Sequence, residues 1–395
     1  MNMVKLDQDE LFEYLENNRI DVIAVAISSW HALGIDAFLY DISKKYKRKV
    51  KALVLIIPHQ RDGYIISEKD FQYRDSVDLK FEFIDIPLNN QNFIQERVPN
   101  FISKYIKMFS GLRNIRSHDG INDLFLLSPH LTYNELLIYF NNKIISSKYK
   151  PVFVLIDEGY ASYVSKENWN SLRSEVSREE DYSILDTVSS KIFRSVDYII
   201  SIIILRSIKV ESRFLLNVEF QLTMNENICD SYKEVLKLRN NDLKMDIVGK
   251  TVLIISQPFS EMDIIPLMTE LNLMQSLIKF INKNGIKPIL KPHPREKSDK
   301  YNDLKDCDFE VIENNFPVEE IIPKLNPICV IGYTSTALLN SKIFFDVNAI
   351  SLLDVMLSKS DDKRDDDSNG EFKNLTGKYV NFVDKIEDIK KYLTD

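Results

Sequence analysis

Residues 152–159 read VFVLIDEG: a run of apolar residues, then two carboxylates, then a glycine. Such a run is typical of a strand buried in a parallel sheet, and open α/β sheets bind ligands just past the carboxyl ends of their strands. Asp157, Glu158 and Gly159 are therefore expected at a functional edge. One carboxylate can face a site there, and burial that raises its pKa suits a general base. The plain alternative is an acidic pair at a strand-to-turn junction.

Strand-like and helix-like segments alternate on both sides of this stretch, which is the pattern of α/β proteins with parallel sheets. We expect strands at the apolar runs 21–27, 51–57, 79–86, 123–127, 152–156, 196–205, 251–256, 287–291 and 329–331. We expect helices at 35–47, 93–108, 133–145 and 266–284, and another after Ser335 that leads into the apolar run 343–347. Residues 28–31 are expected to form a turn, and residues 205–222 an extended segment.

The polar stretch 240–250 (NNDLKMDIVGK) separates two such alternations. We therefore expect two Rossmann-like domains, 1–245 and 246–395, with a ligand held between the sheets. With 395 residues and 44% hydrophobic side chains, each domain can bury a core without disulfides or a metal. The chain contains no G-x-G-x-x-G and no G-x-x-x-x-G-K-[ST] motif, which argues against NAD enzymes and P-loop NTPases.

The composition argues against several other classes. The 51 basic and 59 acidic side chains give a net charge of −8, the wrong sign for general nucleic-acid binding. The three cysteines form no C-x-x-C pair, which argues against disulfide frameworks and zinc knuckles and favours a reducing cytoplasm. We expect no signal peptide, because the start of the chain, residues 1–7 (MNMVKLD), has no apolar h-region. We expect no spanning helix, because the most apolar run, 196–205, is about half the length that a membrane span needs.

Two charged runs each have two interpretations. The basic run 44–51 (KKYKRKVK) is either the solvated end of a helix, where cations suit the helix dipole, or a patch for an anionic polymer or lipid. The second interpretation implies a peripheral contact with the inner membrane surface. The acidic run 361–367 (DDKRDDD) is expected to be a loop rather than a metal site, because no apolar anchors hold its carboxylates in a convergent arrangement.

A second candidate segment, residues 291–296 (KPHPRE), follows the predicted strand 287–291. His293 stands between two prolines, so its backbone is stiff and extended, and Lys291 and Arg295 add positive charge. This setting suits an imidazole that gives a proton or hydrogen bond to a departing phosphate. The alternative is a structural histidine.

A third segment, residues 332–337 (GYTSTA), lies between a predicted strand and helix. Hydroxyls and free N–H groups at a helix N-terminus can bind an anion; the alternative is a plain N-cap at Thr334 or Ser335. Glu319 opens a short predicted helix. Its carboxylate could bind ribose hydroxyls or simply complement the helix dipole.

The ordered set Asp157-Glu158-Gly159, His293-Pro294 and Ser335-Thr336 resembles the motifs of bacterial sialyltransferases of the GT-B fold, namely the lipooligosaccharide sialyltransferases and the capsular polysialyltransferases. Residues 254–259 (IISQPF) are similar to the strand and loop that open the donor domain in the lipooligosaccharide group. The resemblance covers four short patches between residues 157 and 336. It implies α/β architecture with two Rossmann-like domains facing each other across a cleft.

The resemblance further implies an inverting transfer from CMP-sialic acid to an oligosaccharide or polysaccharide acceptor, without a metal or other cofactor, in bacterial capsule or lipooligosaccharide synthesis. The first domain would take the acceptor and carry the base, and the second would bind the CMP donor. Glu158, or else Asp157, would be the base, and His293 would protonate the leaving CMP. The implied donor-binding residues are Gln257, Lys291, Pro294, Glu319, Ser335 and Thr336.

Other expectations remain open at this stage. Trp30 and His31 could line the acceptor side, although a structural role for His31 is slightly favoured. Tyr160 departs from the small or hydroxylated residues that often follow the acidic triplet, which puts the acceptor geometry in doubt. A transferase of another activated donor, such as a CDP-polyol, is the alternative enzyme, and a non-catalytic carbohydrate-binding protein is a third interpretation. The sequence indicates neither the linkage formed nor an oligomeric state.

Overall fold

The structure is a computed structural model of the whole chain. It describes residues 19–57, 66–83, 106, 122–129, 149–157, 159, 210–214, 226–239, 249–262, 264–294, 296–297, 299–304, 307–312, 316–359 and 366–393.

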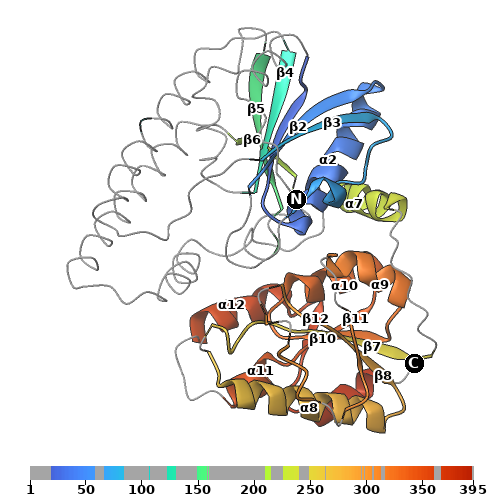
Figure 1. Ribbon diagram of the computed structural model, residues 1–395, viewed down its shortest axis with the longest axis vertical. Coiled ribbons are helices and arrows are strands. Elements are labelled where there is room, and N and C mark those ends of the chain that lie inside the picture. Colours follow the sequence, from blue (N-terminus) through green and yellow to red (C-terminus); the bar gives the residue numbers. More distant parts are fainter. Residues whose placement is uncertain are drawn as a thin grey trace.

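The first part of the chain forms a six-stranded sheet in the order β3-β2-β1-β4-β5-β6, and every paired strand is parallel to its neighbour (Figure 1). Its elements are β1 (Val22–Ala26), α2 (Ser29–Tyr46), β2 (Val50–Ile56), the 3₁₀ turn η1 (Glu68–Asp70), β3 (Val77–Phe83), β4 (Asn122–Ser128), β5 (Tyr149–Ile156), β6 (Val210–Phe214) and α7 (Glu226–Leu238).

The second part forms another six-stranded parallel sheet, in the order β12-β11-β10-β7-β8-β9. Its elements are β7 (Thr251–Ile255), α8 (Leu267–Lys283), β8 (Lys287–Lys291), β9 (Glu310–Val311), α9 (Val318–Leu325), β10 (Cys329–Gly332), α10 (Thr336–Phe345), β11 (Asn348–Ser351), α11 (Leu353–Leu357), α12 (Asp366–Thr376), β12 (Val380–Phe382) and the 3₁₀ segment η4 (Ile386–Tyr392).

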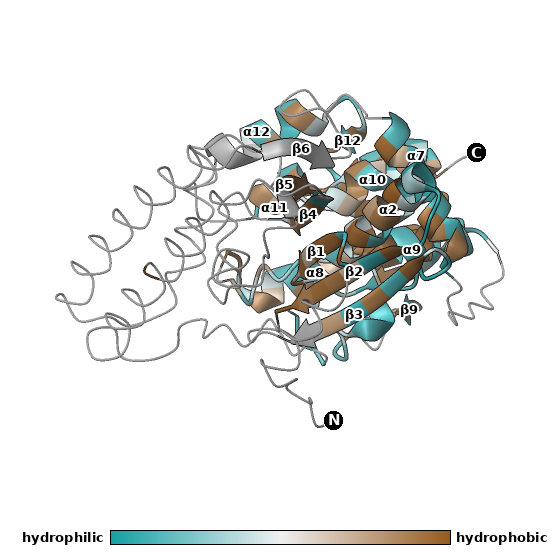
Figure 2. Ribbon diagram, turned by 90° about the horizontal axis from the view of Figure 1, so that it is seen from above, coloured by the Kyte–Doolittle hydropathy of each residue, from teal (hydrophilic) through white to brown (hydrophobic). Residues whose placement is uncertain are grey.

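Each sheet has the strand order of a dinucleotide-binding Rossmann domain, with two strands on one side of its first strand and three on the other. The central strands β1 and β7 are buried at every position, as strands covered on both faces must be. Figure 2 shows β1 and β2 as largely hydrophobic ribbons beside helices of mixed colour. The chain therefore has the predicted α/β architecture, with the two Rossmann-like domains of a GT-B protein.

Helix α2 begins six residues earlier than predicted. We expected a turn at 28–31 and a helix from 35, but Ser28 is the N-cap and its hydroxyl accepts a hydrogen bond from the backbone N–H of His31 at 3.3 Å. That bond satisfies a donor that would otherwise be unpaired in the first turn. The serine pair thus starts the helix directly after β1.

Two further stretches differ from expectation, and three predicted elements lie wholly or almost wholly outside the described residues. The helix after Ser335 was expected to lead into the apolar run 343–347, but α10 includes most of that run, since it continues to Phe345, and the next strand is β11. The acidic run 361–367 is not wholly a loop, because α12 begins at Asp366. The predicted helix 133–145 and strand 196–205 lie outside the described residues, as does the predicted helix 93–108 except for one residue in helical conformation.

The domains are joined by a buried ion network at the end of α7. The Arg239 guanidinium donates to Asp36 Oδ2 of α2 at 2.9 Å and to Glu320 Oε1 of α9, and all these side chains are at most 2% exposed. It also donates to the carbonyl of Asp70 at 2.8 Å. Because Asp36 belongs to the first domain and Glu320 to the second, Arg239 fixes one domain against the other.

Aromatic rings extend the same interface. Tyr232 of α7 is fully buried, with its ring centroid 5.6 Å from that of Trp30 and 6.0 Å from that of Phe344 of α10. Phe344 thereby joins the hydrophobic core of the first domain. Figure 1 shows α9 and α10 on the side of the second domain that faces the first.

Candidate active site

The acidic triplet forms a tight turn at the carboxyl end of β5. The Asp157 side chain is fully buried, and its Oδ1 accepts a hydrogen bond from the backbone N–H of Gly159 at 2.5 Å. Gly159 has φ +83°, a left-handed conformation that favours glycine. Glu158, the preferred base of the sequence interpretation, lies outside the described residues.

This turn lies directly against the hydroxyl pair of the other domain. A Cβ built on Gly159 would lie 2.8 Å from Thr336 Oγ1 and 3.2 Å from Thr336 Cγ2. Thr336 opens α10, just past the carboxyl end of β10. The carboxyl edges of the two sheets therefore meet here, and they bring the first and third candidate segments together.

Ser335 is the N-cap of α10, and its hydroxyl accepts from the backbone N–H of Ala337 at 3.2 Å. The capping interpretation is thus correct for Ser335, not for Thr334. The Gln257 amide holds the preceding residue instead: its Oε1 accepts from the Thr334 backbone N–H at 2.8 Å, and its Nε2 donates to Thr334 Oγ1 at 3.0 Å. The loop after β7 therefore supports the start of α10.

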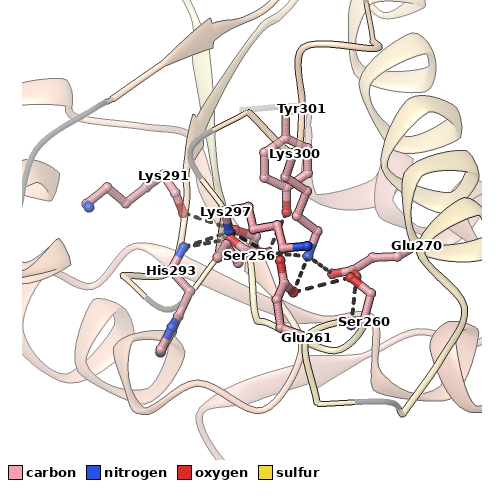
Figure 3. Close-up of polar contacts among 10 residues, drawn as sticks. Ser256, Ser260, Glu261, Glu270, Lys291, His293, Lys297, Lys300 and Tyr301 are labelled. Atoms are coloured by element: carbon pink, nitrogen blue, oxygen red, sulfur yellow. Dashed lines mark hydrogen bonds and ion pairs between the residues drawn. The ribbon is translucent and has the colours of Figure 1, made fainter. Parts of the chain in front are cut away.

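The His293 loop is held through its backbone. The His293 N–H donates to Glu296 Oε2 at 2.8 Å and to the Ser256 hydroxyl at 3.2 Å. Figure 3 shows the His293 ring directed away from these partners. Pro294, expected at the donor site, is exposed in the turn that follows.

Lys291 ends β8 and is only 7% exposed. Burial lowers the pKa of its ammonium to about 8, although the negative charge of Glu296 acts in the opposite direction. A buried cation gains more than a solvated one from an anionic ligand. The Lys291 side chain also points away from Lys300 and Glu261 (Figure 3).

Glu319 is buried, at 4% exposure, rather than open to solvent. Its Oε1 accepts from the Asn340 amide at 2.7 Å, which ties α9 to α10. Burial raises the pKa of Glu319, and the charges of Glu320 and Asp157 raise it further, whereas the Asn340 hydrogen bond lowers it. The carboxylate thus already serves the helix packing, and its role toward a ribose stays a prediction.

The two candidate acceptor residues lie at the start of α2. His31 is 5% exposed, and its Nδ1 accepts from the backbone N–H of Ile27 at 3.3 Å, so it does have the structural role that was slightly favoured. Trp30 packs on Tyr232 at the domain interface. Whether either residue also contacts an acceptor stays a prediction.

The basic run 44–51 lies at the opposite end of α2 from the site. The helix has 18 residues, so its last turn is about 27 Å from its start beside the carboxyl end of β1. Lys44 lies over the Tyr40 ring at 4.1 Å, and Arg48 pairs with Asp21 at 2.6 Å. These cations therefore do not line the edge where the candidate segments meet.

Sequence reasoning missed the residues that hold the site in place. Arg239 and its two carboxylate partners were not singled out, and Glu296 was quoted without a role. Asp36 carried a usable signal, because a carboxylate inside the apolar stretch 35–39 of a helix must be paired when the helix is buried. No local signal identifies Arg239, whose partners come from distant parts of the chain.

Within the described ranges, no helix is both long and apolar enough to cross a membrane. The same residues contain no group of three or more His, Cys, Asp or Glu side chains suited to a metal ion.

Paired Rossmann-like domains that meet at the carboxyl edges of their sheets place this molecule in the GT-B class. Residues 23–354 match the sequence model of the alpha-2,8-polysialyltransferase family, and the chain belongs to that family. It is therefore a glycosyltransferase of the sialyltransferase kind. A search of curated protein sequences finds no match.

Solved structures similar to this one include two epimerases and a sialyltransferase. The alpha/beta-galactoside alpha-2,3-sialyltransferase of the luminous marine bacterium Photobacterium phosphoreum is 11% identical, with 94% of this chain and 100% of that chain covered and a TM-score of 0.43. The UDP-GlcNAc 2-epimerase of Neisseria meningitidis is 12% identical, covering 94% and 90%, with a TM-score of 0.47. That of Methanocaldococcus jannaschii is 13% identical, covering 95% and 92%, with a TM-score of 0.49.

Proposed function

We propose that the protein transfers sialic acid from CMP-sialic acid to an oligosaccharide or polysaccharide acceptor, with inversion at the anomeric carbon and without a metal. The observation that carries this proposal is the close approach of Gly159 to Thr336. It joins an acidic turn of one domain to a hydroxyl-bearing helix start of the other. An acceptor-activating carboxylate and a phosphate-binding helix terminus are the two parts that an in-line transfer needs on either side of a sugar.

Glu158 is the proposed base. The neighbouring carboxylate, Asp157, is fully buried and already accepts the Gly159 N–H, so it is less available to an acceptor hydroxyl and instead stabilises the turn. A base at Glu158 would take the proton of the acceptor hydroxyl as its oxygen attacks the anomeric carbon of the sialic acid.

His293 is the proposed acid. As the bond from the anomeric carbon to the CMP phosphate oxygen breaks, its imidazolium gives a proton to that oxygen. Ser335 and Thr336, with the N–H groups that start α10, would bind the phosphate, and the Lys291 ammonium would add charge. Gln257 would hold the loop that carries the hydroxyls, since it already bonds Thr334.

In this proposal the first domain, residues 1–245, takes the acceptor and the second, residues 246–395, binds the donor. The setting is the cytoplasm of a bacterium that builds a capsule or lipooligosaccharide. The basic end of α2 supports a peripheral contact with an anionic inner membrane surface, because its lysines are solvated and lie away from the site.

The test is CMP release from CMP-sialic acid by the purified protein, with sialylated or galactose-terminated acceptors and with EDTA. Glu158→Gln and His293→Ala are compared with the wild type. We expect EDTA-resistant release that both substitutions reduce by about 10²–10⁴-fold, the usual contribution of general acid–base groups. Absence of both CMP release and CMP binding in the wild type would contradict the donor, and unaffected variants would contradict the assigned roles.

A further inference from the structure

A single buried ammonium is surrounded by carboxylates beside the His293 loop. The Lys300 side chain is 1% exposed, and its Nζ lies 2.9 Å from Glu261 Oε2, 2.8 Å from Glu270 Oε1 and 2.8 Å from Glu296 Oε1 (Figure 3). The three carboxylates come from the loop after β7, from α8 and from the His293 loop. Lys300 thus ties together three segments of the second domain.

Glu296 connects this cluster to His293 because both of its oxygens are used. Oε1 faces the cluster, where it accepts from Lys300 and from the Tyr301 hydroxyl at 2.7 Å. Oε2 faces the other way, where it accepts from the His293 N–H at 2.8 Å and from the Ser256 hydroxyl. The carboxylate is therefore a fixed bridge between the buried ammonium and the histidine backbone.

The flanking prolines explain why a single hydrogen bond from Glu296 can fix the His293 backbone. Pro292 and Pro294 have no backbone N–H, so the His293 N–H is the one backbone donor of the Pro-His-Pro segment. The proline rings already restrict the backbone dihedral angles of this segment. One charge-assisted hydrogen bond then fixes the direction in which the imidazole leaves the backbone.

We propose that Glu296 is a positioning residue for the transfer: held by Lys300, it fixes the His293 backbone so that the imidazole reaches the leaving phosphate. This inference rests on the proposed role of His293 as acid. Glu296 acts through His293 and does not itself touch the donor.

Glu296→Gln isolates this role. An amide accepts with one oxygen only, and its NH₂ group cannot face the Lys300 ammonium. The oxygen of the new side chain must turn toward Lys300, which leaves its NH₂ opposite the His293 N–H and removes that hydrogen bond. The matched control is Glu270→Gln, which changes another partner of Lys300 whose second oxygen accepts from the Ser260 N–H rather than from His293.

The kinetic test measures kcat and the donor KM for CMP release. We expect Glu296→Gln to lower kcat by about 10–100-fold, as a displaced catalytic group does, with the donor KM changed less than about threefold. Adding Glu296→Gln to His293→Ala should cause no further loss, because the acid is already absent. Glu270→Gln should keep near wild-type kcat. Losses that multiply in the double variant, or an equal loss in Glu270→Gln, would overturn the inference.

A second measurement does not depend on the donor. The chain has 5 histidines, so ¹³C-labelled imidazole signals can be assigned by substitution, with His293→Ala marking the signal of interest. We expect Glu296→Gln to shift or broaden the His293 signal while that of His31 stays in place, and Glu270→Gln to leave both unchanged. An unmoved His293 signal overturns the positioning role. If Glu296→Gln shifts the His293 signal but the wild type releases no CMP, the donor assignment alone is contradicted.

Discussion

Gly159 and Thr336 belong to different domains, yet a single Cβ on Gly159 would lie 2.8 Å from Thr336 Oγ1. Such a distance is far inside ordinary van der Waals contact, so the backbone of the acidic turn lies directly on the helix start. The candidate active site is thus assembled at a point where the carboxyl edges of the two sheets are in direct contact.

Gly159→Ala should therefore destabilise the protein and disrupt the site together. The left-handed backbone costs alanine about 1–2 kcal/mol, and the clash with Thr336 adds about 1–3 kcal/mol. The matched control is Gly285→Ala, because Gly285 has φ +73° but open space around its Cβ position. Thermal unfolding and CMP release measure both effects. Equal effects of the two substitutions would mean that the contact with Thr336 is unimportant, whereas partial rescue by Thr336→Ala would support it.

Gln257 should affect stability and donor binding in separable ways. Gln257→Ala leaves the part-buried Thr334 N–H without its acceptor, which costs about 1–3 kcal/mol of unfolding free energy. Gln257→Glu keeps an acceptor oxygen but places a negative charge near the proposed phosphate site, so the donor KM should rise while stability changes less. Denaturant titration and steady-state kinetics distinguish the two, and a Glu variant with an unchanged KM would place the phosphate elsewhere.

Arg239 should be essential to the assembly of the two domains. Arg239→Met leaves the Asp36 and Glu320 carboxylates buried without their cation, which costs about 3–5 kcal/mol. Lys237→Met is the control, since this lysine of the same helix pairs with Glu234 at the exposed surface and should change stability little. Chemical unfolding followed by tryptophan fluorescence suits the measurement, because Trp30 lies at the interface. Similar losses in both variants would rule out the special role of the buried network.

Lys291 should give the reaction an upper pH limit. Burial lowers the pKa of this amine from 10.5 to about 8, so in the free enzyme its charge is lost as the pH rises through about 8. If that charge binds the donor phosphate, kcat/KM falls above this pH, approaching about tenfold per unit. Lys291→Arg keeps the positive charge at high pH, so the fall in kcat/KM above about pH 8 should disappear in this variant.

The lowered pKa of Lys291 affects stability in the opposite direction from activity: stability rises with pH where kcat/KM falls. Between about pH 8 and 10.5 the unfolded chain binds the proton that the folded chain has released, so the contribution of Lys291 to stability rises with pH across this window. Below about 8 both states are protonated and the full cost of burying the charge remains. Thermal midpoints of wild type and Lys291→Met across this range measure the difference.

The strands could be predicted because their signal is local. The run 287–291 (KPILK) matches β8 at both ends, since a short apolar centre between polar ends is compatible with few other structures in an α/β protein. The end of α10 was not predicted within the run 343–347, because Phe344 and Phe345 are apolar for another reason: they end a helix that packs against both domains. Periodicity over so short a run does not separate these cases.

The parts of the site could be predicted, but their assembly could not. Each candidate segment follows a strand, and that position is visible in the sequence. That Gly159 lies on Thr336 depends instead on how the domains are packed, which is decided by contacts such as Tyr232 with Phe344. Contacts between residues so distant along the chain leave no local pattern to recognise.

The ion network at Arg239 also implies an order of events during synthesis. Its guanidinium is 203 residues from Asp36 and 81 residues from Glu320 along the chain. Since the N-terminal domain leaves the ribosome first, Arg239 can pair with Asp36 before Glu320 has been made. In the nascent first domain Arg239 then has only one of its two carboxylate partners, and Glu320 of α9 supplies the second when the second domain folds. The ion pairs of Arg239 that stabilise the folded protein thus also define the position at which the second domain docks.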